Sequence, residues 1–372
     1  MKYFLIAGEA SGDLHGSSLV RALRQEDPGA DIRCWGGSLM EAAGATLMKH
    51  YRELAFMGFL EVVLHLRTIL RNFRQCKSEI LDFQPDVLIL IDYPGFNLRM
   101  ATWAKKNGLR VFYYISPQLW AWKSGRVNIV RQSVDRMFVI FPFEKDFYQK
   151  HGVEVEFHGH PLLDALARKT VSTGFFQKNN LPKDKPLIAI LPGSRRQEIR
   201  RMLGVMLEVV PHFPGYQFVI AGAPAIEHSF FEPFLVKYPG VRLVENQTYS
   251  LLEHARAALV TSGTATLETA LHEVPQIVCY RGSPGSYWLA KRLVNKDLQF
   301  IAIVNLIAGK KVVEELIQHD LNVKRLKPEL ERLLAPEGRQ QVLNGYAFVR
   351  ERLGQAGASQ RVAQKMVRLL RQ

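Results

Sequence analysis

YFLIAGEASGD (residues 3–13) joins a short apolar run to a turn that contains two glycines. Tyr3–Ala7 has the length and composition of one buried strand. Gly8 and Gly12 permit a tight turn, and an amphipathic pattern then runs from about Leu14 to Gln25. This order of strand, turn and helix is one repeat of a parallel sheet covered by helices.

The same alternation continues along the chain in two series. The expected strands of the first series are Ile32–Trp35, Val87–Ile91, Val111–Ile115 and Met137–Ile140, and those of the second are Leu187–Leu191, Phe218–Ala221, Val241–Val244, Ala257–Val260 and Ile277–Tyr280. A polar stretch from Arg168 to Pro186 separates them, and the chain from Pro328 onward has a helical pattern only. We therefore expect two doubly wound α/β domains, residues 1–168 and 186–340, with a cleft between them and C-terminal helices in residues 341–372.

Composition indicates a globular protein without a membrane span. The chain has 372 residues, of which 47% are apolar and 23% charged. Its longest apolar runs have only the length of a buried strand, and the N-terminus predicts no signal peptide. Cys34, Cys76 and Cys279 have no paired spacing, which argues against disulfides or a zinc site and favours a reducing cytoplasm.

The charge balance is strongly basic. Lys and Arg number 49 against 35 Asp and Glu, which gives a net charge of +14 and a pI near 9.7. Such an excess favours polyanionic partners, namely nucleic acid, anionic lipid or phosphorylated substrates. Charge alone does not choose among these three.

In open α/β sheets, ligands bind in the loops that follow the carboxyl ends of strands. The first such loop contains Glu9, Ser11 and Gly12, with His15 close behind. Its free backbone N–H groups suit a phosphate or a sugar hydroxyl, although an ordinary turn with a helix cap has the same pattern. Because it lacks the GxGxxG spacing, a dinucleotide site is a weak interpretation.

Asp92 follows the apolar strand Val87–Ile91 directly, within the segment IDYPGFN (Ile91–Asn97). A carboxylate in this place could accept the proton of an attacking hydroxyl group as a general base. The structural alternative is an aspartate that caps the next helix.

Two further loops of the first half are candidates for substrate contact. SPQLWAW (Ser116–Trp122) contains Gln118 and Trp120 and precedes two basic residues, a composition that suits a phosphate-bearing, partly apolar substrate. Paired tryptophans belong to the core more often than to a site. His160 in Gly-His-Pro is likewise more often structural than catalytic.

The second half contains two turns of a different kind. Gly193, Ser194 and Arg195 open a helix that carries Glu198, and this pattern provides N–H groups and a guanidinium for a diphosphate. The P-loop spacing is missing. The second turn has Ser262, Gly263 and Thr264, and Glu268 in the helix that follows could bind the two hydroxyls of a ribose. Arg281 and Asn305 lie in later loops of the same domain.

One segment has the pattern of a membrane-binding surface. Apolar residues, which include Phe56, Met57, Phe59 and Leu60, precede Arg67, Arg71 and Arg74 at helical spacing. An apolar patch beside a basic helix face suits an anionic lipid surface. The alternative is an ordinary amphipathic helix that packs on the sheet.

Taken together and in this order, these segments resemble the lipid-A-disaccharide synthases. The resemblance covers the whole chain and rests on AGEASGD (Ala7–Asp13), LAFMGFLEV (Leu54–Val62), IDYPGFN (Ile91–Asn97), SPQLWAW (Ser116–Trp122), FPFEKDFY (Phe141–Tyr148), GHP (Gly159–Pro161), LPGSR (Leu191–Arg195), SGTATLE (Ser262–Glu268), YR (Tyr280–Arg281) and NLIAG (Asn305–Gly309). Where relatives often carry Asp at position 95, this chain has Gly95, so Asp92 is the only carboxylate of its loop.

The resemblance implies a GT-B fold with two facing Rossmann-like domains. The first domain would bind the acceptor, the second would bind the UDP-sugar, and a C-terminal helix would cross back to the first. The family joins UDP-2,3-diacylglucosamine to 2,3-diacylglucosamine 1-phosphate (lipid X) and releases UDP, in lipid A biosynthesis on the cytoplasmic face of the Gram-negative inner membrane. The expected partners are these two substrates and an anionic membrane surface, with no nucleic acid and with a possible homodimer.

The residues and the resemblance together give one mechanistic hypothesis. Asp92 activates the acceptor 6-hydroxyl for an inverting displacement, while the turns at residues 193–195 and 262–264 stabilise the departing UDP. Glu268 would hold the ribose, and Arg281 and Asn305 would contact donor phosphate or sugar. Glu9, Ser11, Gly12, His15, Gln118 and Trp120 would form the acceptor side. No cofactor is expected, and no metal, because no Asp-x-Asp pair is present.

Three other functions remain open from the sequence. A UDP-N-acetylglucosamine 2-epimerase can share the fold, but it needs no lipid-binding patch. A basic peripheral binding protein explains the charge of +14 but not two turns of phosphate-binding type. An NAD-dependent oxidoreductase is the weakest alternative, because its glycine fingerprint is missing.

Overall fold

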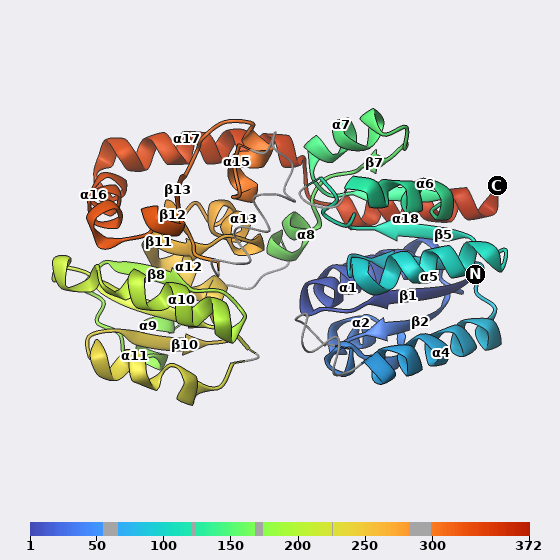
Figure 1. The fold of residues 1–372 in the computed structure, drawn as a ribbon, viewed down its shortest axis with the longest axis horizontal. Helices are drawn as coiled ribbons and strands as arrows, with labels where there is room; N and C mark the ends of the chain where they lie inside the picture. The colour runs from blue at the N-terminus through green and yellow to red at the C-terminus, as the bar shows by residue number, and fades with distance from the viewer. Residues whose placement is uncertain (55–65, 121–123, 168–173, 225, 283–298) are drawn as a thin grey trace. The chain divides into compact units, whose positions relative to one another are not determined.

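The computed structural model describes residues 1–54, 66–120, 124–167, 174–224, 226–282 and 299–372. The chain divides into two compact units (Figure 1). Unit 1 contains Met1–Lys169 together with Leu353–Gln372, and unit 2 contains Thr170–Arg352. Residues 341–352 therefore belong to unit 2 and residues 353–372 to unit 1.

Unit 1 is built on a parallel sheet whose order, in the part of the chain that the structure describes, is β3-β2-β1-β4-β5-β6-β7. Its strands are β1 (Lys2–Ala7), β2 (Asp31–Gly36), β3 (Thr46–His50), β4 (Val87–Ile91), β5 (Val111–Tyr114), β6 (Arg136–Val139) and β7 (Glu156–Phe157). The central strands β1 and β4 are almost wholly buried because helices cover both faces of the sheet. Since all these strands run in parallel, their carboxyl ends meet at one edge.

The helices of unit 1 alternate with these strands (Figure 1). They are α1 (Ala10–Glu26), α2 (Ser38–Ala42), α4 (Leu66–Phe83), α5 (Pro94–Lys106), α6 (Val127–Ser133), α7 (Pro142–Lys150), α8 (Pro161–Ala167) and α18 (Ala358–Arg371). The main core lies under α4, α5 and α6, where Phe73, Phe96 and Tyr113 pack together with the strands.

Unit 2 repeats this architecture with the described strand order β10-β9-β8-β11-β12-β13. The strands are β8 (Leu187–Leu191), β9 (Gln217–Gly222), β10 (Arg242–Glu245), β11 (Ala255–Thr261), β12 (Gln276–Tyr280) and β13 (Glu314–Ile317). The helices are α9 (Phe175–Lys178), α10 (Arg196–Leu207), α11 (Glu232–Lys237), α12 (Thr248–His254), α13 (Thr264–Leu271), α15 (Ile303–Ala308), α16 (Val323–Leu334) and α17 (Pro336–Leu353).

The expected strands are confirmed, two of them to the residue and the others within two residues at each end. The sequence patterns missed β3, β7 and β13. β3 (TLMKH) is an edge strand with polar residues, β7 has only two residues, and β13 begins with two glutamates. Such short or polar edge strands lack the apolar run by which buried strands are recognised.

The last helix belongs to unit 1, as the sequence predicted for a C-terminal helix that returns to the first domain. α18 packs against α1 and α8. The carboxylate of Asp164 in α8 accepts backbone N–H groups at the start of α18, from Gly357 (2.5 Å), Ala358 (3.1 Å) and Ser359 (2.8 Å). This buried carboxylate satisfies donors that a helix N-terminus otherwise leaves without partners.

We expect Asp164→Ala to lower the free energy of unfolding of unit 1 by about 2–3 kcal/mol, because three backbone N–H groups, two of them buried, lose a charged acceptor. The measurement is urea unfolding, together with hydrogen exchange of residues 358–371, which should become fast. Asp146→Ala, on the exposed side of α7, is the matched control. Equal stability and equal exchange in the two variants would show that the cap does not hold α18.

Candidate active site

Two consecutive left-handed residues form the turn after β4. Asp92 has φ +46° and Tyr93 has φ +49°, although neither is a glycine. Such conformations cost energy and are concentrated at functional sites. The turn therefore marks the carboxyl end of β4 as a candidate site, where the sequence predicts a general base.

Side chains of neighbouring elements hold this turn in place. The Asn97 side-chain amide lies 2.8 Å from the carbonyl oxygen of Asp92, 3.2 Å from that of Ile91 and 3.3 Å from that of Ile6. The Tyr113 hydroxyl donates to the Asp92 carbonyl at 2.6 Å. The backbone of Asp92 is thus fixed by two side chains, and its carboxyl group takes no part in these hydrogen bonds.

Gly8 allows the first loop to approach this turn. A Cβ atom at Gly8 would lie 2.3 Å from ring atoms of Tyr93, so any other residue would displace the ring. The Tyr93 hydroxyl donates to the carbonyl oxygen of Leu54 at 3.1 Å. The loop after β1 can therefore pack on the loop after β4 only because the predicted tight turn has a glycine at position 8.

The carboxyl group of Asp92 has an unusual acidity. Burial, and next the negative charge of Glu9, raise the pKa of Asp92 to about 7, and a backbone hydrogen bond at Tyr93 opposes the rise. A group with a pKa near neutrality can both accept and release a proton under physiological conditions, which suits a general base. The structure thus brings the predicted Asp92 and Glu9 into one electrostatic environment.

Glu144 is a second buried carboxyl group at this edge, and the sequence patterns assigned it no role. Its carboxylate accepts the backbone N–H groups of Ile140 (3.1 Å) and Phe141 (2.9 Å) at the start of α7. Burial raises the pKa of Glu144 to about 7, with a smaller contribution from Asp92. The only signal in the sequence is the position of Glu144 just after β6, in FPFE.

Several residues of the first loop have structural roles. Asp13 caps α2 by accepting the backbone N–H groups of Leu39 and Met40. Gly12 packs on β1, because a Cβ atom there would lie 3.1 Å from the Cβ of Ala7. Ser11 is half-buried at the start of α1.

The rings of the half-buried His15 and the buried His160 lie edge to face, with 6.2 Å between their centroids. Burial lowers the pKa of His15 to about 4 and that of His160 well below its usual value, so both rings are neutral at physiological pH. His160 Nδ1 accepts the backbone N–H of Leu162 and so caps α8, which agrees with the structural interpretation of this residue.

Gln118 and Trp120 follow β5. Gln118 is exposed, whereas Trp120 is buried and packs edge to face on Phe143 with 5.0 Å between ring centroids. Of this pair, Gln118 alone presents its side chain to solvent in the described structure. Trp120 belongs to the apolar packing beneath the loop.

In unit 2, the turn after β8 has the conformation that the sequence predicts. Gly193 has φ +108°, and a Cβ atom there would lie 3.0 Å from Oε2 of Glu198. Ser194 and Arg195 are exposed, and Arg195 Nη1 lies 3.8 Å from Oε1 of Glu198. The N-terminus of α10 and an exposed guanidinium are therefore close together, as a diphosphate site requires.

The second turn of unit 2 follows β11. Gly263 has φ +153° and precedes α13, Thr264 is exposed, and Ser262 donates its hydroxyl hydrogen to the carbonyl oxygen of Ile301 at 3.1 Å. Glu268 lies one turn into α13, on the same side as Thr264. Both turns of unit 2 lie at the carboxyl edge of its sheet.

Arg281 and Asn305 are bound to their own chain. Arg281 donates to the backbone carbonyl oxygens of Gln318 and Leu321. Asn305 is fully buried and donates to Val313 and Glu315, while its Oδ1 accepts two backbone N–H groups, one of them from Val312 at 2.7 Å. A direct contact of Asn305 with a donor would require these bonds to break.

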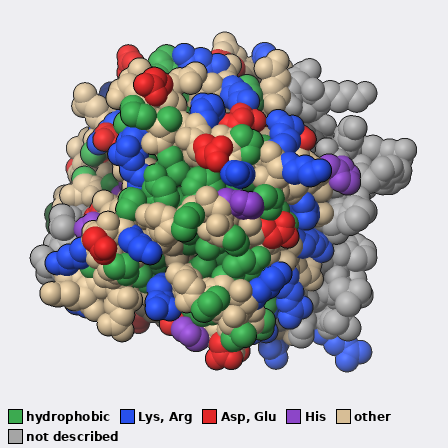
Figure 2. Space-filling model, turned by 90° about the vertical axis from the view of Figure 1, so that its left-hand side faces the viewer, with side chains coloured by type: hydrophobic (Ala, Val, Ile, Leu, Met, Phe, Trp, Pro, Cys, Tyr) green, Lys and Arg blue, Asp and Glu red, His purple; other side chains and the backbone are tan. Residues whose placement is uncertain are grey.

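The apolar residues of the expected membrane patch, Phe56, Met57, Phe59 and Leu60, lie outside the described residues. Arg67, Arg71 and Arg74 are exposed on α4. Within the described ranges, no helix is long and apolar enough to cross a membrane. Figure 2 shows a different face, the left-hand side of Figure 1 with elements of unit 2, on which lysines and arginines surround a central apolar area with acidic side chains among them.

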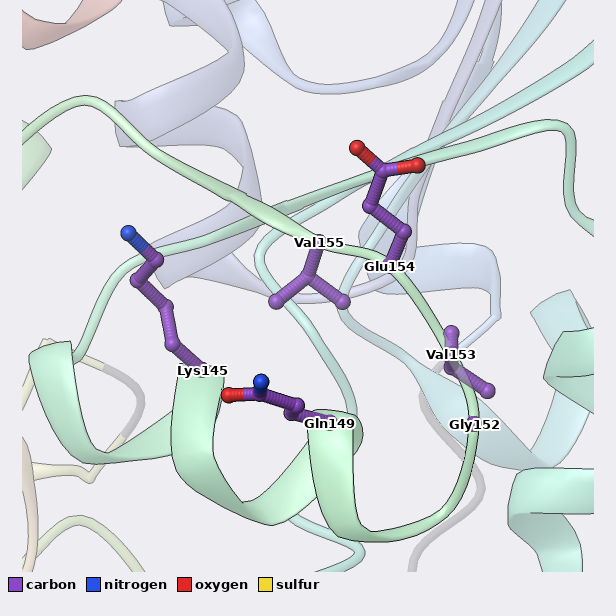
Figure 3. A pocket seen from close by; sticks show the side chains of 6 residues that line it. All are labelled: Lys145, Gln149, Gly152, Val153, Glu154 and Val155. Carbon is purple, nitrogen blue, oxygen red and sulfur yellow. The ribbon is translucent and has the colours of Figure 1, made fainter.

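A surface hollow of about 400 Å³ lies beside α7 (Figure 3). It is lined by Lys145, Gln149, Gly152, Val153, Glu154 and Val155, and none of the predicted site residues is among them. The described side chains contain no group of three His, Cys, Asp or Glu residues that could hold a metal ion. The strand-end loops therefore remain the candidate site.

Comparison with known proteins identifies the family. The family model described as lipid-A-disaccharide synthetase matches residues 3–367. The chain belongs to this family. It is 41% identical over 374 residues to the lipid-A-disaccharide synthase of Syntrophus aciditrophicus, with 99% of this chain and 97% of the relative covered. It is 40% identical over 376 residues to the synthase of Geobacter metallireducens, with the same coverage. As a member of the synthetase family, the chain is a glycosyltransferase of lipid A biosynthesis.

Solved structures share the fold of this chain. The co-structure of S. aureus MnaA with UDP has a TM-score of 0.73 at 14% identity and covers 100% of this chain and 97% of its own. The glycotransferase of kitacinnamycin has a TM-score of 0.66 at 13% identity and covers 99% of both chains. At such identities the likeness concerns the fold alone, which is the GT-B fold with two Rossmann-like α/β domains.

The raised pKa of Asp92 predicts the pH dependence of this family member. A base must be ionised to accept a proton, so kcat/KM should fall about tenfold per pH unit below a pKa near 7 and level off above it. In Glu9→Gln, one negative charge is removed, the pKa of Asp92 falls, and the acidic limb moves to lower pH. Glu41→Gln, exposed on α2, is the control. An acidic limb that stays in place in Glu9→Gln would exclude Asp92 as its source.

Proposed function

We propose that the chain joins UDP-2,3-diacylglucosamine to 2,3-diacylglucosamine 1-phosphate, forms the β-1,6-linked disaccharide phosphate and releases UDP. The family membership supports the reaction class. The observation that carries the mechanism is the carboxyl group of Asp92, presented by a left-handed turn at a strand end with a pKa near 7.

In the proposed reaction, Asp92 accepts the proton of the acceptor 6-hydroxyl. The hydroxyl oxygen forms a bond to the anomeric carbon, the bond from that carbon to the diphosphate oxygen breaks, and UDP leaves with the electron pair. This single displacement inverts the configuration at the anomeric carbon. The acceptor would be contacted by Glu9, Ser11, His15 and Gln118. The loops that carry these residues would be held in shape by the packing of Gly12 and Trp120.

Unit 2 would bind the donor. The N–H groups of the turn at Gly193 and Ser194, the guanidinium of Arg195 and the turn at residues 262–264 would stabilise the negative charge that develops on UDP. Glu268 would accept hydrogen bonds from the ribose. The presence of UDP in the MnaA co-structure, which has the same fold, supports a uridine nucleotide. Asn305 and Arg281 would support this region through the backbone that they bind.

We expect Asp92→Asn to lower kcat by about 10²–10⁴-fold, because the amide cannot accept the proton, and to leave the affinity for UDP nearly unchanged. The measurement is release of UDP from both diacylglucosamine substrates in detergent, with the disaccharide identified by mass spectrometry. Near-normal turnover would remove Asp92 as the base.

The same assay tests the reaction itself. Acceptor-dependent release of UDP together with disaccharide supports the proposal. Epimerised sugar from UDP-N-acetylglucosamine alone, without disaccharide, would instead assign the chain to the epimerases with which it shares its fold.

We further propose that the enzyme binds the cytoplasmic face of the inner membrane as a peripheral protein. Both substrates are acylated, the net charge is +14, and Arg67, Arg71 and Arg74 form an exposed row on α4. Such a row attracts anionic headgroups.

A homodimer that exchanges α18 would reuse the cap at Asp164, because the same carboxylate could accept the helix of a second copy.

Replacement of these three arginines by glutamine should weaken binding to anionic vesicles about 100-fold, since each basic residue near the surface contributes about 1 kcal/mol. The measurement is flotation with vesicles that contain phosphatidylglycerol, against vesicles of phosphatidylcholine. The control replaces Arg325, Arg332 and Arg350, which lose the same charge but are ion-paired on α16 and α17. Equal flotation of both triple variants would show that α4 is not the contact surface.

A further inference from the structure

A hydrogen bond between side chains joins two helices at the ligand-binding edge of unit 2. Tyr249, in the first turn of α12, donates its hydroxyl hydrogen to Oε1 of Glu268 at 2.9 Å. α12 follows β10 and α13 follows β11, so both residues lie at the carboxyl edge of the sheet. This is the edge at which open α/β sheets bind their ligands.

The surroundings hold Tyr249 in this orientation. Its ring packs on the ring of His272, with 5.1 Å between centroids, and His272 Nδ1 lies 2.8 Å from the backbone carbonyl oxygen of Glu268. Burial and the adjacent carboxylate raise the pKa of Tyr249, so the phenol stays protonated and remains a donor. Both partners of the hydrogen bond are therefore anchored on neighbouring turns of α12 and α13.

The hydrogen bond also affects the charge of Glu268. Burial raises the pKa of Glu268, and the bond from Tyr249 lowers it. Tyr249 thus favours the ionised carboxylate, which only accepts hydrogen bonds. An ionised carboxylate has about four lone-pair directions on its two oxygens, and Tyr249 occupies one of them. The carboxylate retains acceptor capacity for a pair of adjacent hydroxyl groups.

We propose that Tyr249 is a positioning residue for nucleotide recognition, which orients the Glu268 carboxylate toward the two vicinal hydroxyls of a ribose. The proposal rests on the proposed function, in which Glu268 holds the ribose of UDP. It adds a specificity: the site selects a ribonucleoside diphosphate over its deoxy analogue, and Tyr249 sets the degree of selection. A hydrogen bond with only a structural role would stabilise α12 and α13 without affecting this choice.

The test compares the Kd of UDP with that of 2′-deoxy-UDP by calorimetry. A site built to bind a hydroxyl group rejects an analogue that lacks it, so the wild-type protein should prefer UDP by about 10-fold or more. In Tyr249→Phe we expect this preference to fall about 5- to 10-fold, through weaker binding of UDP with little change for 2′-deoxy-UDP. Tyr238→Phe, at the end of α11, is the matched control and should keep the wild-type preference.

Steady-state kinetics provide a second readout. Ribose contacts are made equally in the ground state and the transition state, so Tyr249→Phe should raise KM for the UDP-sugar and leave kcat nearly unchanged. In Glu268→Gln the preference for UDP over 2′-deoxy-UDP should also be lost. The double variant with Tyr249→Phe should show nearly the same preference as Glu268→Gln alone, because both substitutions act through one carboxylate.

The outcomes separate this inference from the proposed function. A wild-type preference that persists in Tyr249→Phe, even with a lower melting temperature, overturns the positioning role and leaves the ribose site intact. A wild-type protein that binds UDP and 2′-deoxy-UDP equally overturns the ribose contact of Glu268 and the inference with it. A wild-type protein that binds neither overturns the proposed function itself.

Discussion

The side-chain amide of Asn97 determines the geometry of unit 1 at its carboxyl edge. It donates to carbonyl oxygens at the ends of two adjacent strands, β1 and β4, and to that of Asp92. Without these bonds, the Asp92 carbonyl would keep only its hydrogen bond from the Tyr113 hydroxyl, and the left-handed turn would lose most of what offsets its strain. Because the turn is held, the ring of Tyr93 can pack against Gly8. The loop that carries Glu9 is thereby close enough for its charge to raise the pKa of Asp92.

Burial shifts the pKa values of carboxyl groups and of imidazoles at this edge in opposite directions. It disfavours whichever form of a group is charged, so it raises the pKa of Asp92 and Glu144 and lowers that of His15 and His160. Near pH 7 the two imidazoles are neutral and the two carboxyl groups titrate. The residues best suited to move a proton at this edge are therefore carboxyl groups, although histidine is the usual choice in proteins.

The sequence predicted elements whose signal is local. Val87–Ile91 is a strand because five apolar residues stand together, and Asp92 is the first polar residue beyond them. Contacts between distant residues were not predictable. Asp13 ends the segment AGEASGD, which contains the first candidate loop, but its carboxylate caps a helix that begins 25 residues later. Asn305 was expected at the donor, yet its side chain binds its own backbone seven and eight residues further along the chain.

Glu144 and Tyr249 were missed for a related reason. A glutamate in the first turn of a helix predicts a cap, and only the burial supplied by other elements gives it a perturbed acidity. Tyr249 lies 19 residues before Glu268, and only the adjacent placement of α12 and α13 makes them partners. Local patterns thus locate the loops of the site, while tertiary packing decides which side chain in each loop is available for chemistry.

The proposed reaction places opposite electrostatic demands on its base and on its leaving group. The base needs a pKa near neutrality, and a guanidinium a few ångströms away would lower the pKa of a carboxyl group by about 1–3 units. The departing UDP needs positive potential, and a nearby carboxylate would repel it. In the described structure, Asp92, Glu9 and Glu144 follow strands of unit 1, whereas Arg195 and the two glycine turns follow strands of unit 2. The two demands are therefore met on separate sheets, each with its own burial and charge. A substitution in one sheet can change proton transfer without changing nucleotide affinity, or the reverse.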